Sequence, residues 1–322
     1  MPERPNSKNS WAGTDRSDGL VLTSVWPTGT VGVATQLAEG GYHDATGADP
    51  ALMPPAIARH AIAMFTRPGD VVLDPDCGAG TTIVEALRCG RHAIGLTGRR
   101  RWWRLARTNV TVTKARGAFA DGMVLILDRR PGTSAAATTA GMTSRVGLLL
   151  TTLRLPAPNT DTVAAVERVR QLLAQHRPLL RPGGHVVITC PPWRHPVRHD
   201  LLDLPGQILA AGSAAGLAPI ARCEALTATV RRGRTHTRAT LGQRRVAARA
   251  ERALGHPVTL PAHHTVLVFR ADPDAGVRHP AQPIPLLSAP AGSRHLGRRN
   301  ARMQTTVGPA AHRSAEGSRE AA

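Results

Sequence analysis

The residues of this chain with the clearest chemical potential form one short turn between an apolar strand and a helix. The strand, residues 70–73, ends in Asp74-Pro75; Gly78 and Gly80 follow, and a helix opens at Thr81-Thr82. Glycines let a backbone approach a ligand closely, and the first turn of a helix offers N–H groups that have no partner within the helix. The pattern therefore predicts a binding site for a nucleotide-type cofactor.

The residue types in this turn narrow the choice of ligand. Their spacing is not the GxGxxG of dinucleotide-binding proteins, and no Lys-Ser/Thr pair follows that would indicate a phosphate loop. The run Asp-Pro-Asp-Cys-Gly-Ala-Gly-Thr-Thr over residues 74–82 instead resembles the S-adenosylmethionine (SAM) motif of the DNA amino-methyltransferases, which methylate adenine N6 or cytosine N4. Asp76 replaces the aromatic residue or Met usual in that family. The resemblance implies SAM as the cofactor.

The resemblance also implies roles for the residues of the turn. The carboxylate of Asp74 is expected to contact the amino acid end of SAM, because it complements the ammonium group of methionine. The remaining cofactor residues are expected to line the ligand with their backbone or to cap the helix; they are Pro75, Cys77, Gly78 and Gly80, followed by the capping residues Thr81 and Thr82.

Two further strand ends are expected to contact the nucleoside part of SAM. The fold normally has Asp or Glu after its second strand, where the carboxylate accepts both ribose hydroxyls. This chain has Thr97 there, followed by Arg99-Arg100-Arg101, and a hydroxyl cannot act as a bidentate acceptor. Near the third strand, Asp121 is expected to accept from the adenine amino group or else to be a solvated turn residue.

The catalytic motif of the family departs most from its usual form. Amino-methyltransferases carry Asp/Asn/Ser-Pro-Pro-aromatic after the fourth strand, where it binds the target amine and stacks on the flipped base. If residues 146–152 are the fourth strand, Thr152 stands for the polar residue, and Leu153-Arg154-Leu155 replaces the prolines and the aromatic residue. This reading predicts a catalytic motif that has lost its usual groups.

A second string resembles the same motif further along the chain. Cys190-Pro191-Pro192-Trp193 follows the apolar run 185–189 and would be catalytic if that run were the fourth strand. We favour the other interpretation, in which Leu180–Gly184 (Leu-Arg-Pro-Gly-Gly) introduces the fifth strand. Trp193 is then expected at the rim of the pocket.

The order of elements predicts the fold class. Strands at 70–74, 92–97, 118–127, 146–152, 185–190, 217–230 and 264–270 alternate with helices at 81–90, 100–114, 161–179 and 205–216. This alternation indicates a parallel sheet with helices on both faces. Over about residues 50–270 it resembles the Rossmann-like methyltransferase fold. Ser24-Val25-Trp26 and Asp49–Pro54 also resemble segments of actinobacterial DNA modification methylases, with Asp49 in place of His.

Composition favours a nucleic-acid partner. The formal charge is +19 over 322 residues, and nearly all of the cations are Arg. Such a charge favours binding to a polyanion, although richness in Arg, Ala, Gly and Pro also fits a GC-rich coding bias. A basic segment, residues 231–252, is expected either to contact phosphates or to be a solvated helix and loop. Its candidate contact residues are Arg231, Arg232, Arg234, Arg238, Arg244 and Arg245.

The remaining signals exclude several classes of protein. The four cysteines form no CxxC pair, which fits a reducing compartment and argues against a zinc site. No apolar run is long enough for a membrane span, and residues 1–10 lack the apolar core of a signal peptide. We therefore expect a cytoplasmic protein without a metal. Its domain is expected over 21–271, between disordered ends at 1–20 and 272–322.

The function implied by the resemblance is SAM-dependent methylation of an exocyclic amine of DNA. Two alternatives stay open at this point. One is methylation of RNA. The other is a degenerate relative that binds nucleic acid, with or without SAM, and transfers no methyl group; Thr97 and residues 153–155 favour it, whereas the intact run 74–82 favours an enzyme.

Overall fold

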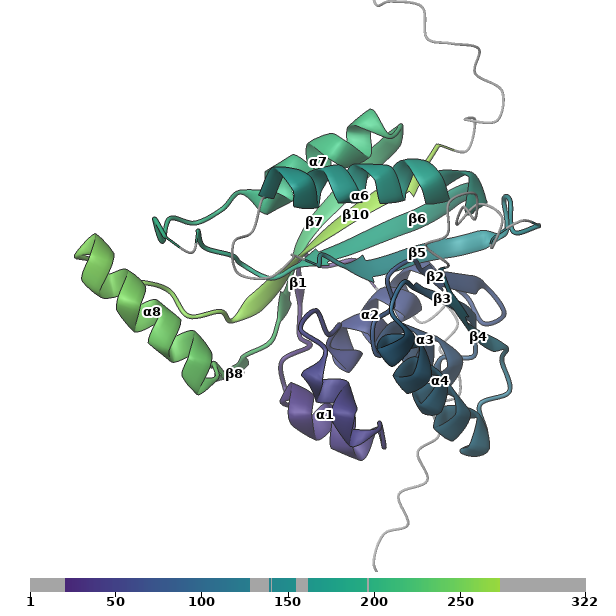
Figure 1. The fold of residues 1–322 in the computed structure, drawn as a ribbon, viewed down its shortest axis with the longest axis horizontal. Helices are drawn as coiled ribbons and strands as arrows, with labels where there is room; N and C mark the ends of the chain where they lie inside the picture. Colours follow the sequence, from purple (N-terminus) through teal and green to yellow (C-terminus); the bar gives the residue numbers. More distant parts are fainter. Residues whose placement is uncertain (1–20, 128–138, 140, 155–161, 196, 273–322) are drawn as a thin grey trace, which may run out of the picture. The chain divides into compact units, whose positions relative to one another are not determined.

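The computed structural model describes residues 21–127, 139, 141–154, 162–195 and 197–272 (Figure 1). These residues belong to one compact unit that spans Met1–Arg278. The ends predicted to be disordered, 1–20 and 272–322, lie outside the described residues, except for Asp272.

The centre of the structure is an eight-stranded sheet. Its order is β1-β7-β10-β6-β5-β2-β3-β4 among the described residues, and β10 is antiparallel to both of its neighbours while the other pairs are parallel. The strands are β1 (Val25–Trp26), β2 (Val71–Asp74), β3 (His92–Thr97), β4 (Gly122–Ile126), β5 (Val146–Thr152), β6 (Leu180–Cys190), β7 (Leu217–Leu226) and β10 (His263–Ala271). The predicted mostly parallel α/β sheet is confirmed.

Helices cover both faces of this sheet (Figure 1). One face carries α2 (Pro55–Phe65), α3 (Thr81–Arg88) and α4 (Arg100–Ala115), and the opposite face carries α6 (Thr162–His176) and α7 (Leu204–Ala214). Outside the two layers lie α1 (Val33–Glu39), the 3-10 turns η2 (Asp44–Ala48) and η3 (Arg177–Leu179), the hairpin β8 (Thr229–Arg231) and β9 (Arg234–His236), and α8 (Leu241–Leu254).

The core has two large clusters because successive side chains of a strand point to opposite faces of the sheet. On β5, Leu148 and Leu150 pack with the buried residues of α2 and α3, whereas Leu149 packs on the side of α6 and α7. On β10, Val268 and Phe269 divide in the same way. Continuous apolar strands such as 146–150 are therefore buried on both faces, as expected for a parallel sheet under helices.

Three details differ from the predicted elements. Leu180–Gly184 is part of β6 rather than a turn before it: Gly183 has φ +70° and the pairing with β5 shifts register between Val146 and Leu148. The predicted strand 217–230 ends at Leu226, and residues 229–231 pair separately with β9. The two-residue β1 was not predicted; Val25 and Trp26 pair with β7, and Trp26 is fully buried.

The connections place a ligand crevice at one point of the sheet. From β2 the chain continues to β3 and β4 on one side, and it then returns to β5 on the other side of β2. In open α/β sheets ligands bind at such a topological switch point, outside the carboxyl ends of the strands. The segments after Asp74 and after Thr152 therefore flank the expected site.

Gly80 begins α3 in a conformation that disfavours other residues. Its φ is +83°, and a Cβ added there would lie 2.8 Å from Ala106 Cβ on α4. We expect Gly80→Ala to lower the free energy of unfolding by about 1–3 kcal/mol, through backbone strain and displacement of α4. Gly90→Ala is the matched control, because Gly90 has φ +73° but open space around its Cβ position. Equal losses in urea unfolding would show that the contact with Ala106 contributes nothing.

Candidate functional site

The turn after β2 is fixed by its own backbone. The N–H of Cys77 donates to the carbonyl of Leu96 (2.9 Å), and that of Gly80 donates to the carbonyl of Cys77 (2.8 Å). Gly78 and Gly80 both have positive φ. The predicted capping role of Thr81 and Thr82 is wrong: they are the first residues of α3, and the N-cap is Gly80, which makes no side-chain cap. The first turn of α3 therefore keeps its N–H groups uncapped by a side chain.

The side chain of Cys77 points into the fold. Its Sγ would lie 2.8 Å from a Cβ at Gly95 on β3, so the glycine is what lets the turn pack on the sheet. Burial raises the pKa of Cys77 well above its usual value, with a further contribution from Asp74. Cys77 is thus a neutral thiol with a packing role, and because its N–H is used by Leu96, its backbone offers a ligand the carbonyl only.

Asp74 is a buried carboxylate at the end of β2. Its side chain is 3 % exposed and accepts a hydrogen bond from the N–H of Asp76 (3.1 Å). Burial raises its pKa to about 6, although the hydroxyl of Thr82 and the N–H of Asp76 lower it in part. Because ionisation of Asp74 is costly in the unliganded protein, a cation bound beside it would stabilise its ionised form. This environment fits the role predicted for Asp74.

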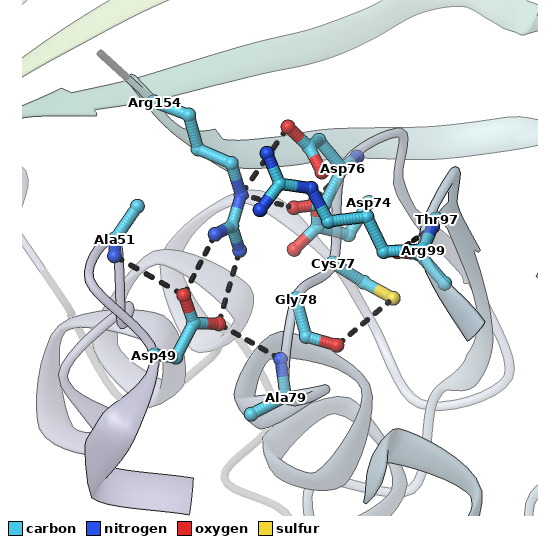
Figure 2. A network of polar contacts seen from close by, with 10 residues as sticks. All are labelled: Asp49, Ala51, Asp74, Asp76, Cys77, Gly78, Ala79, Thr97, Arg99 and Arg154. Carbon is cyan, nitrogen blue, oxygen red and sulfur yellow. Dashed lines mark hydrogen bonds and ion pairs between the residues drawn. The ribbon is translucent and has the colours of Figure 1, made fainter. Parts of the chain in front are cut away.

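An ion pair that the sequence did not reveal lies beside this turn (Figure 2). Arg154 Nη1 and Nη2 donate to the two carboxylate oxygens of Asp49 at 2.7 and 3.0 Å. Asp49 also accepts from the N–H of Ala79 (2.8 Å), and Arg154 Nε donates to the carbonyl of Asp76 (3.1 Å). Although burial raises the pKa of Asp49, the hydrogen bonds from Arg154 and Ala79 bring it below its usual value. The pair thereby joins the segment before α2, the turn and the end of β5.

This pair covers the glycine turn. A Cβ at Gly78 would lie 1.9 Å from Arg154 Nη2 and 1.9 Å from Asp49 Oδ2, so only glycine fits beneath it. Arg154 retains 17 % exposure of its side chain and Asp49 only 2 %. A small cavity of about 30 Å³ adjoins Arg154, between Asp76, the end of β5 and α6. The guanidinium therefore lies at the switch point itself.

The end of β3 carries the weak acceptor that the sequence predicted. Thr97 is 1 % exposed, and its Oγ1 accepts from the N–H of Arg99 at 3.4 Å. The neighbouring side chain of Arg99 extends toward Asp76 (Figure 2). Burial raises the pKa of Asp76 above its usual value, although Arg154 and, to a smaller extent, Arg99 lower it in part. Beyond this, a cavity of about 140 Å³ is lined by Arg100, Trp103, Arg104 and Ile126.

Of the two roles predicted for Asp121, the structure favours the solvated turn residue. Gly122, the residue after it, pairs with Ala93 at the start of β3, whereas the ligand edge is marked by the pair Thr97 and Ile126. Four residues of strand separate the two edges, or about 13 Å. Asp121 is an exposed side chain that contacts His92 Nδ1 at 3.4 Å. The other role assumed that the strand begins before the aspartate, whereas it begins after it, at Gly122.

Thr152 ends β5, as the favoured interpretation required. Its hydroxyl is 2.9 Å from that of Thr189 and donates to Met53 Sδ at 3.5 Å. β5 pairs directly with β2, so residues 146–152 are the fourth strand of the core. Leu153 after it is buried in the apolar cluster. The structure thus brings Thr152 to the correct edge but leaves its hydroxyl bonded to neighbours.

The alternative catalytic string lies one strand away. β6 pairs with β5 and β10, not with β2, so the interpretation in which 185–190 is the fourth strand is wrong. Cys190 is 1 % exposed, and burial raises its pKa to about 12, which leaves a poor acceptor for an amine. Pro191 and Pro192 follow the strand, and Trp193 packs partly buried against the cluster that includes Leu149. These residues form a strand exit.

The basic segment folds as an exposed hairpin and helix. Its six candidate residues are all exposed: Arg231, Arg232, Arg234 and Arg238 on and after the hairpin, and Arg244 and Arg245 on α8. A capping box of Thr240 and Gln243 starts α8, which buries Ala250 alone. Contact with phosphates stays a prediction.

Within the described ranges there is no cluster of three His, Cys, Asp or Glu side chains suited to a metal.

Comparison with known proteins identifies the part of the chain that carries the turn. Residues 1–105 match the N6_N4_Mtase family, described as DNA methylase. This part of the chain is similar to the DNA methylases. The Type II methyltransferase M2.DpnII of Streptococcus pneumoniae is 33 % identical over 91 residues, which are 28 % of this chain and 31 % of that enzyme. The matched residues thus span about a third of the curated relative. The methylase match includes Asp49, Asp74–Thr82 and Thr97, and it ends before β5, β6 and α8.

Solved methyltransferases show low similarity over a larger share of the chain. Geranyl diphosphate methyltransferase in complex with SAM has a TM-score of 0.41 and 16 % identity, and covers 67 % of this chain and 85 % of its own. A SAM-dependent methyltransferase of Methanosarcina mazei has a TM-score of 0.41 and 12 % identity, over 66 % of this chain and 97 % of its own.

Sequence reasoning missed the partnership of Asp49 and Arg154, although a signal was present. Both residues depart from the pattern of the methylases: Asp49 replaces a His before the first core helix, and Arg154 replaces a proline after the fourth strand. Two departures of opposite charge that flank one site indicate a compensating pair.

Among the described helices, none is both long and apolar enough to cross a bilayer.

Proposed function

We propose that this protein binds SAM at the turn Asp74–Thr82 and transfers its methyl group to an exocyclic amine of DNA, adenine N6 or cytosine N4. The observation that carries the proposal is the buried Asp74 carboxylate at the topological switch point, beside two glycines with positive φ and the uncapped start of α3. The match of this segment to the DNA methylases supports both the cofactor and the substrate.

The residues present fit the cofactor. Asp74 would receive the ammonium of the methionine end, and the backbone of Pro75, Gly78 and Gly80 would line it. Thr97 would offer a single hydroxyl to the ribose, which costs about 1.5–3 kcal/mol relative to the usual carboxylate. When bound, SAM supplies an electrophilic methyl group on a sulfonium. Thr152 marks the edge of β5 where the target amine would approach.

Titration of the purified protein with SAM, followed by transfer of labelled methyl groups, tests this proposal. We expect calorimetry to give a dissociation constant in the micromolar range, and label to appear in duplex DNA. Digestion of the product to nucleosides would distinguish N6-methyladenine from N4-methylcytosine. A folded protein that binds no SAM at millimolar concentration would refute the cofactor assignment, and label in RNA alone would refute the choice of DNA.

The exposed arginines of α8 are expected to contact DNA phosphates. Arg244→Gln together with Arg245→Gln should weaken binding to duplex DNA and should lower the slope of log K against log salt by about 0.9 for each phosphate that the variant no longer neutralises. The weakening should be similar for DNA of any sequence. Fluorescence anisotropy at several salt concentrations measures both quantities. Arg170→Gln on α6 removes a cation that is paired with Glu167, and is the matched control. An unchanged salt slope in the double variant would exclude α8 from the interface.

A second candidate function is favoured by the residues after β5. Leu153 and Arg154 stand where the methylases have two prolines; Leu153 is buried and Arg154 is bound to Asp49, so neither reproduces the proline segment that helps to bind the target amine. A protein with these residues could bind SAM and DNA without transferring the methyl group. SAM binding in calorimetry without any labelled product, at any DNA sequence, would favour this candidate.

A further inference from the structure

We propose that Arg154 binds the carboxylate of the cofactor's amino acid end, and that Asp49 holds it in position to do so. This inference rests on the proposed function, since it concerns the same SAM site. It adds a specificity-determining residue that lies outside the segment matched by the methylase family.

The location of Arg154 carries the first step. The backbone turn Asp74–Gly80 and the end of β5 flank the topological switch point, and Arg154 is the cation that bridges them. Its Nη2 lies 1.9 Å from the Cβ position of Gly78, so the guanidinium covers this glycine of the turn. Asp74 lies in the same turn with its pKa raised to about 6 (Figure 2). A zwitterion at this point meets a carboxylate and a guanidinium.

The hydrogen bonds of Arg154 carry the second step. A guanidinium has five N–H bonds in a fixed plane. Three of them are directed to Asp49 Oδ1, Asp49 Oδ2 and the carbonyl of Asp76. The two that remain, one on each Nη, point to opposite sides of the guanidinium, and each can donate a charge-assisted hydrogen bond to one oxygen of a ligand. Arg154 can therefore bind a ligand carboxylate without giving up Asp49.

The rigidity of Asp49 carries the third step. Its carboxylate is 2 % exposed, and it accepts from the backbone N–H groups of Ala79 and Ala51 as well as from Arg154. Such a carboxylate cannot rotate away to solvent at low cost. The guanidinium is thus pre-organised, which reduces the entropy lost when a ligand binds. A mobile surface arginine would lack this advantage.

Comparison of three adenosine ligands tests the inference by calorimetry. SAM carries the whole amino acid end, decarboxylated SAM lacks only the carboxylate, and 5′-methylthioadenosine lacks both charged groups. We expect the full-length protein to prefer SAM over decarboxylated SAM by about 10–100-fold, the value of a charge-assisted hydrogen bond. In Arg154→Met this preference should vanish, while binding of 5′-methylthioadenosine should stay within about twofold. Arg154→Lys should keep part of the preference.

A second variant protects the test against misfolding. Arg154→Met leaves Asp49 as an unpaired buried carboxylate, so Asp49→Asn with Arg154→Met is made beside it, and should likewise bind SAM and decarboxylated SAM equally. Equal affinity of the unmodified protein for SAM and decarboxylated SAM would overturn the role of Arg154 but would leave the SAM site in place. If the unmodified protein bound no SAM and the double variant bound it, the proposed role of Arg154 would also be overturned. The Asp49–Arg154 pair would then block the SAM site. Failure of all three ligands in every variant would refute the proposed function itself.

Discussion

Asp74→Asn is expected to weaken SAM binding by roughly 100-fold or more and, at the same time, to stabilise the unliganded protein. Loss of one charge from a buried pair costs about 3 kcal/mol or more, which corresponds to that factor in affinity. Stability moves in the opposite direction because the ionised carboxylate of Asp74 is buried without a salt bridge to any described cation. An asparagine can still accept from the N–H of Asp76 and carries no charge to desolvate.

The pH dependence of this effect follows from the sign of the shift. The pKa of Asp74 is about 6 in the folded protein, and an unfolded aspartate titrates near 3.9. The folded state binds the extra proton between these values, so stability falls as the pH rises from about 4 to about 6. We expect Asp74→Asn to match the original protein near pH 4 and to exceed it by about 1–3 kcal/mol at pH 7.5. Urea unfolding at the two pH values measures the difference.

The matched control for Asp74→Asn is Asp121→Asn. Asp121 is an exposed aspartate at the opposite edge of the sheet, so this variant makes the same chemical change away from the site. It should alter neither SAM binding nor the pH profile. SAM affinity of the original protein should also fall below about pH 6 as Asp74 becomes protonated, and the Asp74→Asn variant should lack this dependence. SAM affinity that is unchanged in Asp74→Asn would exclude an ionised Asp74 from the cofactor site.

Separation of Arg154 from Asp49 is expected to produce the largest loss of stability. Arg154→Met should lower the free energy of unfolding by about 3–5 kcal/mol, because Asp49 stays buried with its charge uncompensated. Asp49→Asn should cost less, since Arg154 keeps its interactions with Asp76. The double variant should be more stable than the sum of the single losses predicts, with a coupling energy of about 1–3 kcal/mol.

A second double-mutant cycle serves as the control for this pair. Arg170 and Glu167 on α6 form an ion pair of the same length, 2.7 Å, on the surface. Its coupling should be much smaller, because solvent screens exposed charges. Urea unfolding of both sets of variants measures the two couplings under the same conditions. If the two cycles give equal values, the Asp49–Arg154 pair does not contribute more than a surface ion pair.

The fold was largely predictable because the apolar runs of this chain are long and clearly bounded. Residues 92–97 and 146–152 form strands with the predicted limits, since both are largely apolar and each begins directly after an arginine. β1 was not predictable in this way. Two residues carry no periodicity, and the pairing of Val25 and Trp26 with β7 depends on a partner about 200 residues further along the chain. An apolar run likewise does not show that β10 is antiparallel to its neighbours.

The site was predictable only where one segment holds all of its parts. Asp74 and the glycines of the turn lie in one short segment, so the local pattern predicted the strand, the glycine turn and the helix that follows it. The adenine contact predicted for Asp121 depended on the limits of a short strand, which are uncertain by a few residues, and that uncertainty moved the residue from one edge of the sheet to the other. The Asp49–Arg154 pair joins residues 105 positions apart, and only the folded chain brings their charges together.

The position of β10 has a consequence for synthesis on the ribosome. This strand is the last element of the described chain, and it pairs with β6 on one side and β7 on the other. The strands β7 and β1 therefore cannot join the rest of the sheet until residues 263–271 have emerged. Such a topology closes its longest loops last, which slows folding and leaves β6 with an open edge in the nascent chain. Truncation before β10 should therefore leave chains that aggregate, even though every residue of the SAM turn is present.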